Sequence, residues 1–504
     1  MNTTAAATIH RIQSGHTIST QSVQKLKTTC QQVGGAAGAW ALCVVASKCY
    51  LANKYQLAFD LFSCTLELDS QHRSQASKIA WTYSGDVLGS AAGKTINLNW
   101  TQLERWRIAQ DYYNCALAMD ARFVDAKSSL AELLRKRGDL DAALLEFQSI
   151  YSCVGLATTS PTTPTSPTSS DSLDLIFNHA QCLESMCRYE ESLLVLVQHA
   201  ERAIHQLPSV GDATRVAEHA LILLYIKLRF LCGQFNEKGT TSWTALVTLS
   251  QKWSTTVANT IRHKLPTHWA YAFFLRQLWM LRNNSSNGSL DERLPRWIPI
   301  VGDSHCLSMA WARISNATIV PFVATGLKAW HMRKDCQFVT ASNLKCIFKH
   351  LAAADTATKE CFFCVGEIDC REGIANAVKK GKYATVEEAV KSTVCLVLDR
   401  LVCISVEYGL TFHLLSVPPP VDRCQIERAR VVQLWNKELR CQICGEIKEH
   451  LRLVDVEHVS ADGMFLKKHL NADGTHVNRN IVSLVAEVLE GGVERRREEL
   501  EKRR

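Results

Sequence analysis

The sequence lacks a long hydrophobic run, a concentrated basic segment and a glycine-rich phosphate loop. Its apolar stretch at 39–46 is too short to cross a bilayer, and the residues after Met1 lack the positive charges that open a signal peptide. Lys and Arg (57) exceed Asp and Glu (49) by only eight over 504 residues, and the densest basic run, 495–497, is followed at once by acidic residues. These absences exclude a membrane-spanning array and leave nucleic-acid binding and nucleotide-driven chemistry without support.

The twenty cysteines do not have the arrangement of a disulfide scaffold. They are scattered through long apolar segments, where a free thiol behaves as a small buried hydrophobe, and this usage suits a reducing compartment. Cys361 with Cys364 and Cys441 with Cys444 form two C-x-x-C pairs, but the pairs lie farther apart than in compact zinc ribbons. We therefore expect a soluble, cytoplasmic protein without a metal or a cofactor.

The first half of the chain carries a repeated helical pattern, in which a small residue, an aromatic or apolar residue and another small or apolar residue recur at i, i+4 and i+7. Two copies begin at Ala109 and Ala143, which are 34 residues apart, and this is the period of a tetratricopeptide helix pair. Small residues let paired helices cross closely there. The copies are Ala58-Phe62-Thr65, Ala109-Tyr113-Ala116, Ala143-Phe147-Ile150 and, more loosely, Ser192-Leu196-His199.

Changes of composition suggest how the chain is organised. The Ser-, Thr- and Pro-rich stretch near 160 cannot pack a core, and the polar, Asn- and Gly-rich stretch after 282 is the best candidate for a linker. We expect a flexible N-terminus (1–36), tetratricopeptide-like repeats (37–205) with a disordered insertion (157–171), additional helices (206–282), a linker (283–294), an α/β domain (295–490) and a charged helix end (491–504).

Beyond the expected linker, short apolar runs alternate with helical patterns. Thr385 opens a capping box, which predicts a helix to about Val406, and a second helix is predicted at 426–439. This alternation predicts a parallel sheet with helices on both faces, although Pro299 removes one ladder hydrogen bond from the first run. The predicted strands are 297–301, 361–365, 411–417 and 451–456.

Polar residues follow the first and the last of these strands. The first strand runs into Gly302-Asp303-Ser304-His305, ahead of a helical pattern at 306–314, so Ser304 is expected at a helix N-terminus, where N–H groups favour a developing oxyanion. After the last strand, Asp473 and His476 lie three residues apart around a glycine. The carboxylate can orient one imidazole nitrogen and leave the other free as a base. Ligands bind beyond the carboxyl ends of parallel strands, so these residues form a candidate site.

Taken together, these residues resemble the SGNH (GDSL-type) hydrolase family over about residues 295–485. Gly302-Asp303-Ser304 matches its first block, Gly326 its second, Gly366-Glu367-Ile368-Asp369 its third in part, and Asp473 with His476 its last. The Gly-Asp-Ser-His and Gly-Glu-Ile-Asp-Cys-Arg segments also resemble a subgroup of SGNH-like proteins, some of which are fused to tetratricopeptide repeats. The resemblance implies a three-layer α/β domain with a parallel sheet and the activity of a serine ester hydrolase.

The resemblance also implies roles for individual residues. Ser304 would be the nucleophile, His476 its base and Asp473 the residue that orients the base. The backbone N–H groups of Ser304 and Gly326 would bind the oxyanion. Ile368 stands where the family has an Asn that donates to the oxyanion, and Arg371 is the nearest possible replacement. The oxyanion- and substrate-binding set is therefore expected to be Gly326, Gly366, Asp369 and Arg371.

Each of these residues also has a structural interpretation. Ser304 could cap the following helix, Asp369 and Arg371 could form an ion pair at a strand end, and Asp473 with His476 could form an Asx-turn. The leading hypothesis is an acyl or acetyl esterase that acts on an ester-bearing small molecule, glycan or lipid, with repeats that present the substrate or bind a protein or peptide. The alternative is a non-catalytic tetratricopeptide scaffold with a degenerate SGNH-like binding domain.

Overall fold

The computed structural model describes ten segments of the chain, and these form two compact units, 1–166 and 167–504. In the part of the chain so described, no helix is both long enough and apolar enough to cross a membrane. The segments are 20–33, 35–69, 74–90, 100–154, 170–206, 215–235, 242–282, 296–314, 316–354 and 359–491.

The first unit is built from helices that pack in consecutive pairs, α3 with α4, α5 with α6 and α7 with α8. The residues of the three predicted triplets lie on α4, α6 and α8, the second helix of each pair, and all nine are buried. The prediction of a flexible stretch at 1–36 is wrong for 20–33, which form α2. The helices are α2 (Thr20–Val33), α3 (Gly35–Leu51), α4 (Tyr55–Leu68), α5 (Gln75–Gly89), α6 (Gln102–Met119), α7 (Val124–Arg137) and α8 (Leu140–Val154).

The second unit begins with a further set of helices. Ser192 and Leu196 of the fourth triplet are buried on α10, and His199 is half-buried. Most of the predicted insertion at 157–171 lies outside the described residues, and α9 already begins at Ser170. These helices are α9 (Ser170–Ser185), α10 (Tyr189–Gln206), α11 (Val216–Leu231), α12 (Trp243–Thr248), α13 (Thr255–Lys264) and α14 (Pro266–Arg282).

A six-stranded sheet of order β2-β3-β1-β4-β5-β6 follows, in which every pair is parallel except β2 with β3. The helical region followed by an α/β domain with a parallel sheet is confirmed, and all four predicted strands are present. The strands are β1 (Trp297–Gly302), β2 (Arg313–Ile314), β3 (Ala317–Val323), β4 (Glu360–Cys364), β5 (Thr411–Leu415) and β6 (Leu451–Val454).

The segment after β1 differs from the helix predicted at 306–314. It forms a short 3-10 helix, η3 (Ser304–Ser308), and then the edge strand β2. Trp311 adopts a positive φ of 58°, and its N–H donates to the carbonyl of Ile319 at 2.7 Å, so the backbone joins the sheet and leaves the helical path. The sequence analysis missed β3, the strand that receives this bond. Pro299 is tolerated in central β1 because pairing with β4 begins only at Ile300.

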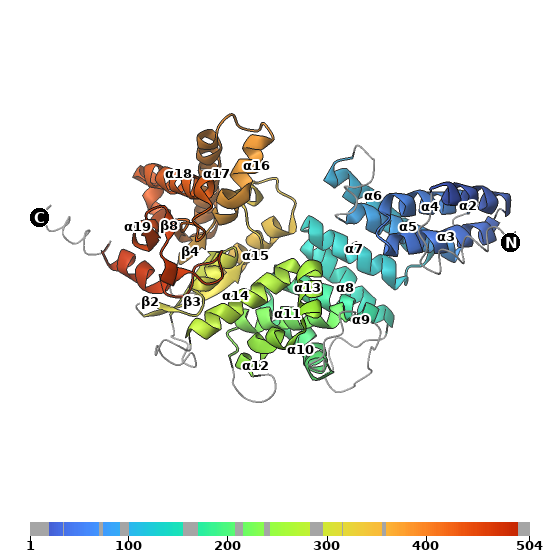
Figure 1. Ribbon diagram of the computed structural model, residues 1–504, viewed down its shortest axis with the longest axis horizontal. Coiled ribbons are helices and arrows are strands. Elements are labelled where there is room, and N and C mark those ends of the chain that lie inside the picture. The colour runs from blue at the N-terminus through green and yellow to red at the C-terminus, as the bar shows by residue number, and fades with distance from the viewer. Residues whose placement is uncertain are drawn as a thin grey trace, which may run out of the picture. The chain divides into compact units, whose positions relative to one another are not determined.

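Three helices connect successive parallel strands, α15 (Val339–Ala353), α17 (Val386–Tyr408) and α18 (Ile426–Gln442). Their connections advance in the same direction along the strand order, and α17 packs against both of the others (Figure 1). Thr385 caps α17 as predicted, since its hydroxyl accepts the N–H of Glu388 at 3.1 Å.

The helices α9–α12 and α14 share one apolar core with the sheet, and its residues run from Ile176 to Val485 along the chain. The indole of Trp311 donates to the carbonyl of Phe230 at 2.7 Å, and Asn343 of α15 donates to the carbonyl of Ser185 at 2.7 Å. The expected linker, 283–294, lies outside the described residues, and the division between compact units falls at 166/167 instead. The helices at 170–282 therefore belong with the α/β domain, which corrects the predicted boundary.

This shared core predicts the behaviour of fragments. A fragment of 167–504 should unfold in one cooperative thermal transition, because it keeps the core intact. A fragment of 296–491 loses the cover of α9–α14, so it should bind the dye ANS and aggregate. Circular dichroism melts and ANS fluorescence of both fragments make the comparison. Cooperative melting of 296–491 without dye binding would contradict the single core.

Candidate active site

The end of β1 positions Ser304. Gly302 lies so close to β4 that a Cβ atom there would come within 2.5 Å of the carbonyl oxygen of Cys364, so only glycine fits. Asp303 then caps η3, because its Oδ1 accepts the backbone N–H of His305 at 2.9 Å. The interpretation of Ser304 as the helix cap is therefore wrong, and its hydroxyl is available to another partner.

A tight loop positions the second half of the site. The N–H of Ala472 donates to the carbonyl of His476 at 2.9 Å, and Asp473 Oδ1 accepts the backbone N–H groups of Thr475 (3.0 Å) and His476 (2.8 Å). The predicted Asx-turn is present. The other carboxylate oxygen of Asp473, Oδ2, lies 2.8 Å from His476 Nδ1, so the turn also orients the ring.

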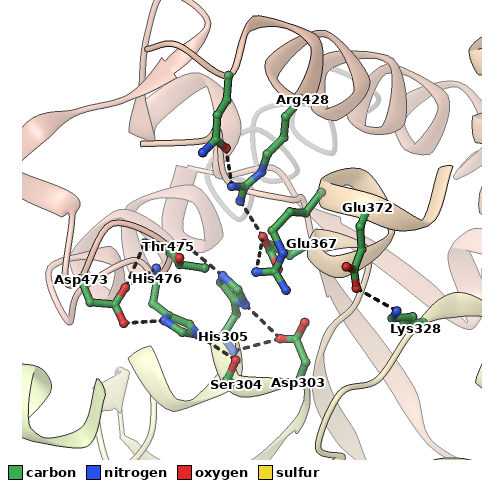
Figure 2. Close-up of polar contacts among 12 residues, drawn as sticks. Asp303, Ser304, His305, Lys328, Glu367, Glu372, Arg428, Asp473, Thr475 and His476 are labelled. Carbon is green, nitrogen blue, oxygen red and sulfur yellow. Dashed lines mark hydrogen bonds and ion pairs between the residues drawn. The ribbon is translucent and has the colours of Figure 1, made fainter. Parts of the chain in front are cut away.

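These two segments meet at the imidazole of His476 (Figure 2). Its Nε2 lies 2.8 Å from Ser304 Oγ, across a separation of 172 residues. The hydroxyl, the imidazole and the carboxylate thus form one continuous hydrogen-bonded chain. A nucleophile, its base and the group that orients the base require this order of contacts.

The environment tunes the two titratable members of this chain. Burial lowers the pKa of His476, the neighbouring His305 adds to that effect, and the hydrogen bond to Asp473 opposes it without reversing it. Burial acts to raise the pKa of Asp473, but the bonds from His476 and from the turn hold it below its usual range. At neutral pH the imidazole is therefore neutral and the carboxylate is ionised, the states in which the pair can accept a proton from a hydroxyl.

Gly326 lies in an exposed turn after β3 and adopts a φ of 70°, which favours glycine. Two side chains of the helical region hold this turn through Thr325. Its Oγ1 accepts a hydrogen bond from Lys227 Nζ at 2.9 Å and lies 3.5 Å from the hydroxyl of Tyr271. Across the described residues, the backbone N–H groups of Ser304 and Gly326 have no hydrogen-bond acceptor in the protein. Both donors are therefore available to a ligand.

Two residues of the preceding helices, which the sequence motifs did not indicate, also contribute to the site. Phe274 of α14 stacks on the His476 ring, with the ring centroids 4.0 Å apart and the planes inclined by 19°. Lys227 of α11 is buried, pairs with Glu184 at 2.5 Å and lies over the ring of Tyr271. Phe274 looks like any core aromatic in the sequence. Lys227, however, interrupts an apolar run, and a charge in such a run is a usable signal.

The third block of the resemblance has a structural position. Asp369 Oδ2 accepts the backbone N–H of Ala329 at 2.9 Å, and burial raises the pKa of this carboxyl to about 6. Arg371 pairs with Glu367 at 3.2 Å, so the predicted ion pair between Asp369 and Arg371 is wrong. Gly366 has a φ of 108° and packs against Trp435.

Asp303, His305 and Glu367 have the chemistry of metal ligands, and their donor atoms lie within 4.8 Å of one another. However, Glu367 is already engaged by Arg428 at 2.5 Å (Figure 2) and by Arg371, so an ion would compete with two guanidinium groups for this carboxylate. The two cysteine pairs lie on different elements. Cys361 and Cys364 are buried on β4, whereas Cys441 and Cys444 are exposed at the end of α18.

Comparison with known proteins adds little to this geometry. No protein-family model and no curated protein matches the chain. A solved structure described as "a putative platelet activating factor from Streptococcus pneumonia" matches 46% of this chain and 98% of its own, with 17% sequence identity and a TM-score of 0.29. A TM-score of this size supports no argument about fold or activity.

The buried carboxyl of Asp369 makes a prediction about pH. Because its folded pKa lies near 6 and its unfolded value near 3.9, ionisation favours the unfolded chain, and stability falls as pH rises from about 4 to 7. The Asp369→Asn variant keeps an oxygen that can accept from Ala329. Relative to wild type, its free energy of unfolding should increase by about 2 kcal/mol between pH 4 and pH 7.

Urea unfolding of both proteins across this pH range measures the difference. Asp86 of the first unit also has a pKa raised to about 6 by burial, but its effect cancels between the two proteins. A pH-independent difference would show that Asp369 is ionised in the folded chain already at low pH.

Proposed function

We propose that this protein is a serine ester hydrolase of the SGNH type, which acts through an acyl-enzyme. The observation that carries the proposal is the chain of contacts from Ser304 Oγ to His476 Nε2 (2.8 Å) and from His476 Nδ1 to Asp473 Oδ2 (2.8 Å). A serine hydroxyl is scarcely ionised at neutral pH and reacts only beside a base. The neutral imidazole of His476 is such a base.

In the proposed reaction, Ser304 Oγ attacks the ester carbonyl while His476 Nε2 takes its proton. The backbone N–H groups of Ser304 and Gly326 hold the oxyanion of the tetrahedral intermediate. The imidazolium then gives its proton to the departing alcohol. Water, activated by the same imidazole, hydrolyses the acyl-enzyme. Asp473 stays ionised throughout and holds the ring in the tautomer with its proton on Nδ1.

The proposed oxyanion site has fewer donors than the family resemblance implies. Ile368 has no donor and is only 8% exposed, and Arg371, the suggested replacement, is engaged by Glu367. Loss of one such donor reduces rates by about 100-fold or more. We therefore propose a slow esterase, unless its substrate supplies a compensating contact.

The substrate is proposed to be an ester-bearing small molecule, glycan or lipid, in keeping with an acyl or acetyl esterase. The first unit is proposed to carry tetratricopeptide-like repeats that bind a protein or peptide. The buried triplets on α4, α6 and α8 support this assignment, because they occupy the positions at which such helix pairs cross.

Ile368 favours a second candidate, a non-catalytic scaffold whose SGNH-like domain is kept for binding. In that case the contact between Ser304 and His476 would remain as a relic of an ancestral site. The two candidates differ in one property, the reactivity of Ser304.

Reactivity is tested with a fluorophosphonate probe on the full chain. Ser304 should be labelled, and Ser304→Ala should abolish the labelling. His476→Ala should slow it by about 100-fold or more, as expected for loss of a general base. Asp473→Asn should slow it by a smaller factor, because the base remains but is badly held. Ser308→Ala is the matched control, because this serine lies on the same short helix and contacts the carbonyl of Val477 instead of an imidazole.

The variants should also keep thermal melting within a few degrees of wild type. Folded wild-type protein that neither reacts with the probe nor hydrolyses a short-chain activated ester is the result that would establish the scaffold. Labelling that persists unchanged in His476→Ala would show that the base is misassigned.

A further inference from the structure

A second imidazole lies against the proposed base. The rings of His305 and His476 are 4.6 Å apart between centroids and inclined by 38°. His305 follows Ser304 directly in the sequence, yet its side chain is only 9% exposed. It makes no hydrogen bond to Ser304 or His476, so it is not part of the proposed proton path, and its close contact with that path calls for another explanation.

The contacts of His305 indicate its protonation state. Nδ1 lies 3.2 Å from the carboxylate Oδ1 of Asp303, and Nε2 lies 3.4 Å from the carbonyl oxygen of Thr475. When Asp303 is ionised, both of these oxygens can accept hydrogen bonds but cannot donate them. A neutral imidazole has one N–H, whereas an imidazolium has two, so only the charged ring satisfies both contacts.

The contacts of His476 indicate the opposite state. Its Nδ1 faces the carboxylate of Asp473, but its Nε2 faces the hydroxyl of Ser304, which can donate. A neutral ring with its proton on Nδ1 satisfies both. The two neighbouring histidines therefore differ because a hydroxyl faces the Nε2 of His476, whereas a carbonyl faces the Nε2 of His305.

We propose that His305 is a positioning residue, an imidazolium held by Asp303 and Thr475 whose charge keeps the adjacent His476 ring in its neutral, proton-accepting form. The effect of His305 on reactivity rests on the proposed function, because both proposals concern the same site. It assigns to His305 control over the pH range in which the site reacts. Like charges repel at this distance, so a second proton on His476 is disfavoured while His305 carries one.

The charged groups around the pair agree with this assignment. Burial acts to lower the pKa of His305, but the charges of Asp303 and Glu367 and the contact with Thr475 raise it to about 9. Asp303 is only 1% exposed, its Oδ1 faces His305, and its Oδ2 has no hydrogen-bond partner in the described part of the chain. Its interaction with His305 overcomes burial and holds its pKa below the usual range.

The remaining neighbours do not compete with Asp303 for His305. Glu367 is shared with Arg428 and Arg371, and the thiol of Cys364 is neutral because burial raises its pKa far above the neutral range. A cavity of about 40 Å³ beside His305 is lined mainly by apolar residues, among them Leu415 at the end of β5, Val417, Val456 and Ile481. The charge of His305 is thus weakly screened.

The sign of the effect follows from the order of protonation. Below about pH 9 His305 is charged and opposes protonation of His476, so reaction with the probe should fall off below pH 6.5, the ordinary value for histidine. The His305→Gln variant removes this charge and leaves Asp303 unpaired nearby. Both changes favour a second proton on His476, and the acidic midpoint should rise by about one pH unit.

The experiment measures fluorophosphonate labelling rates of the full chain from pH 4.5 to 9. In His305→Gln the acidic midpoint should shift upward by about one unit, so the rate at pH 6 should fall several-fold more than the rate at pH 8. His413→Gln is the matched control, because His413 is another buried histidine of this domain and pairs with Glu360 on β4. A purely structural role of His305 would lower both rates by the same factor and leave the midpoint in place, which would overturn the proposal.

A second variant and a second measurement test the proposal independently of the labelling rates of His305→Gln. In Asp303→Asn, the His305 ring loses its carboxylate, so the titration midpoint of His305 itself should fall below about 9. Independently of any reactivity, NMR titration of the full chain labelled with ¹³Cε1-histidine should show His305 protonated up to about pH 9 and a higher titration midpoint for His476 in His305→Gln. An unreactive wild-type protein would end the esterase proposal, whereas equal His476 midpoints in both proteins would end this one.

Discussion

The packing of α11 and α14 against the α/β domain is the interaction on which the rest of the second unit depends. Residues 219–231 of α11 are buried on every side, and a helix that is apolar all round cannot stand in water. Once these helices join the core, Phe274 lies on His476 and Lys227 reaches Thr325. The same burial that stabilises the fold therefore sets the geometry of the candidate site. The helical region precedes the α/β domain in the sequence and also forms one wall of this site.

Buried charge is the second organising feature, and three of the buried charges have a partner of opposite sign. Lys227 pairs with Glu184, His305 with Asp303, and Glu367 with Arg428. An isolated ion in such surroundings would cost several kcal/mol, so removal of one member is more damaging than replacement of both. Pairs of this kind contribute little net stability, but they admit few alternative arrangements. They fix the turn at Thr325, the ring of His305 and the end of β4 relative to one another.

The sequence was most informative where local chemistry decides the outcome. Alternating apolar runs predicted β1, β4, β5 and β6, a cap at Thr385 predicted α17, and Asp473 with His476 predicted a contact with Ser304 that the geometry contains. It was least informative where contacts between distant segments determine the local structure. The strand β3 was missed, and the segment after β1 leaves the helical path only because Trp311 bonds to that strand.

The same limit explains the error over Arg371, whose partner is Glu367, and the misplaced domain boundary. A polar stretch after 282 looks like a linker, but the apolar surface shared across it becomes visible only in three dimensions.

The long separation between Ser304 and His476 has a consequence for biosynthesis. A contact that spans 172 residues closes a very large loop. Such contacts form late in folding, because the chain loses the entropy of loop closure before the contact contributes favourable energy. During vectorial synthesis the serine leaves the ribosome well before the loop at 471–477 exists. At that stage its hydroxyl has no base and is as unreactive as any other serine. Because of the order of residues along the chain, the nascent polypeptide cannot carry out the proposed chemistry until the second unit has folded.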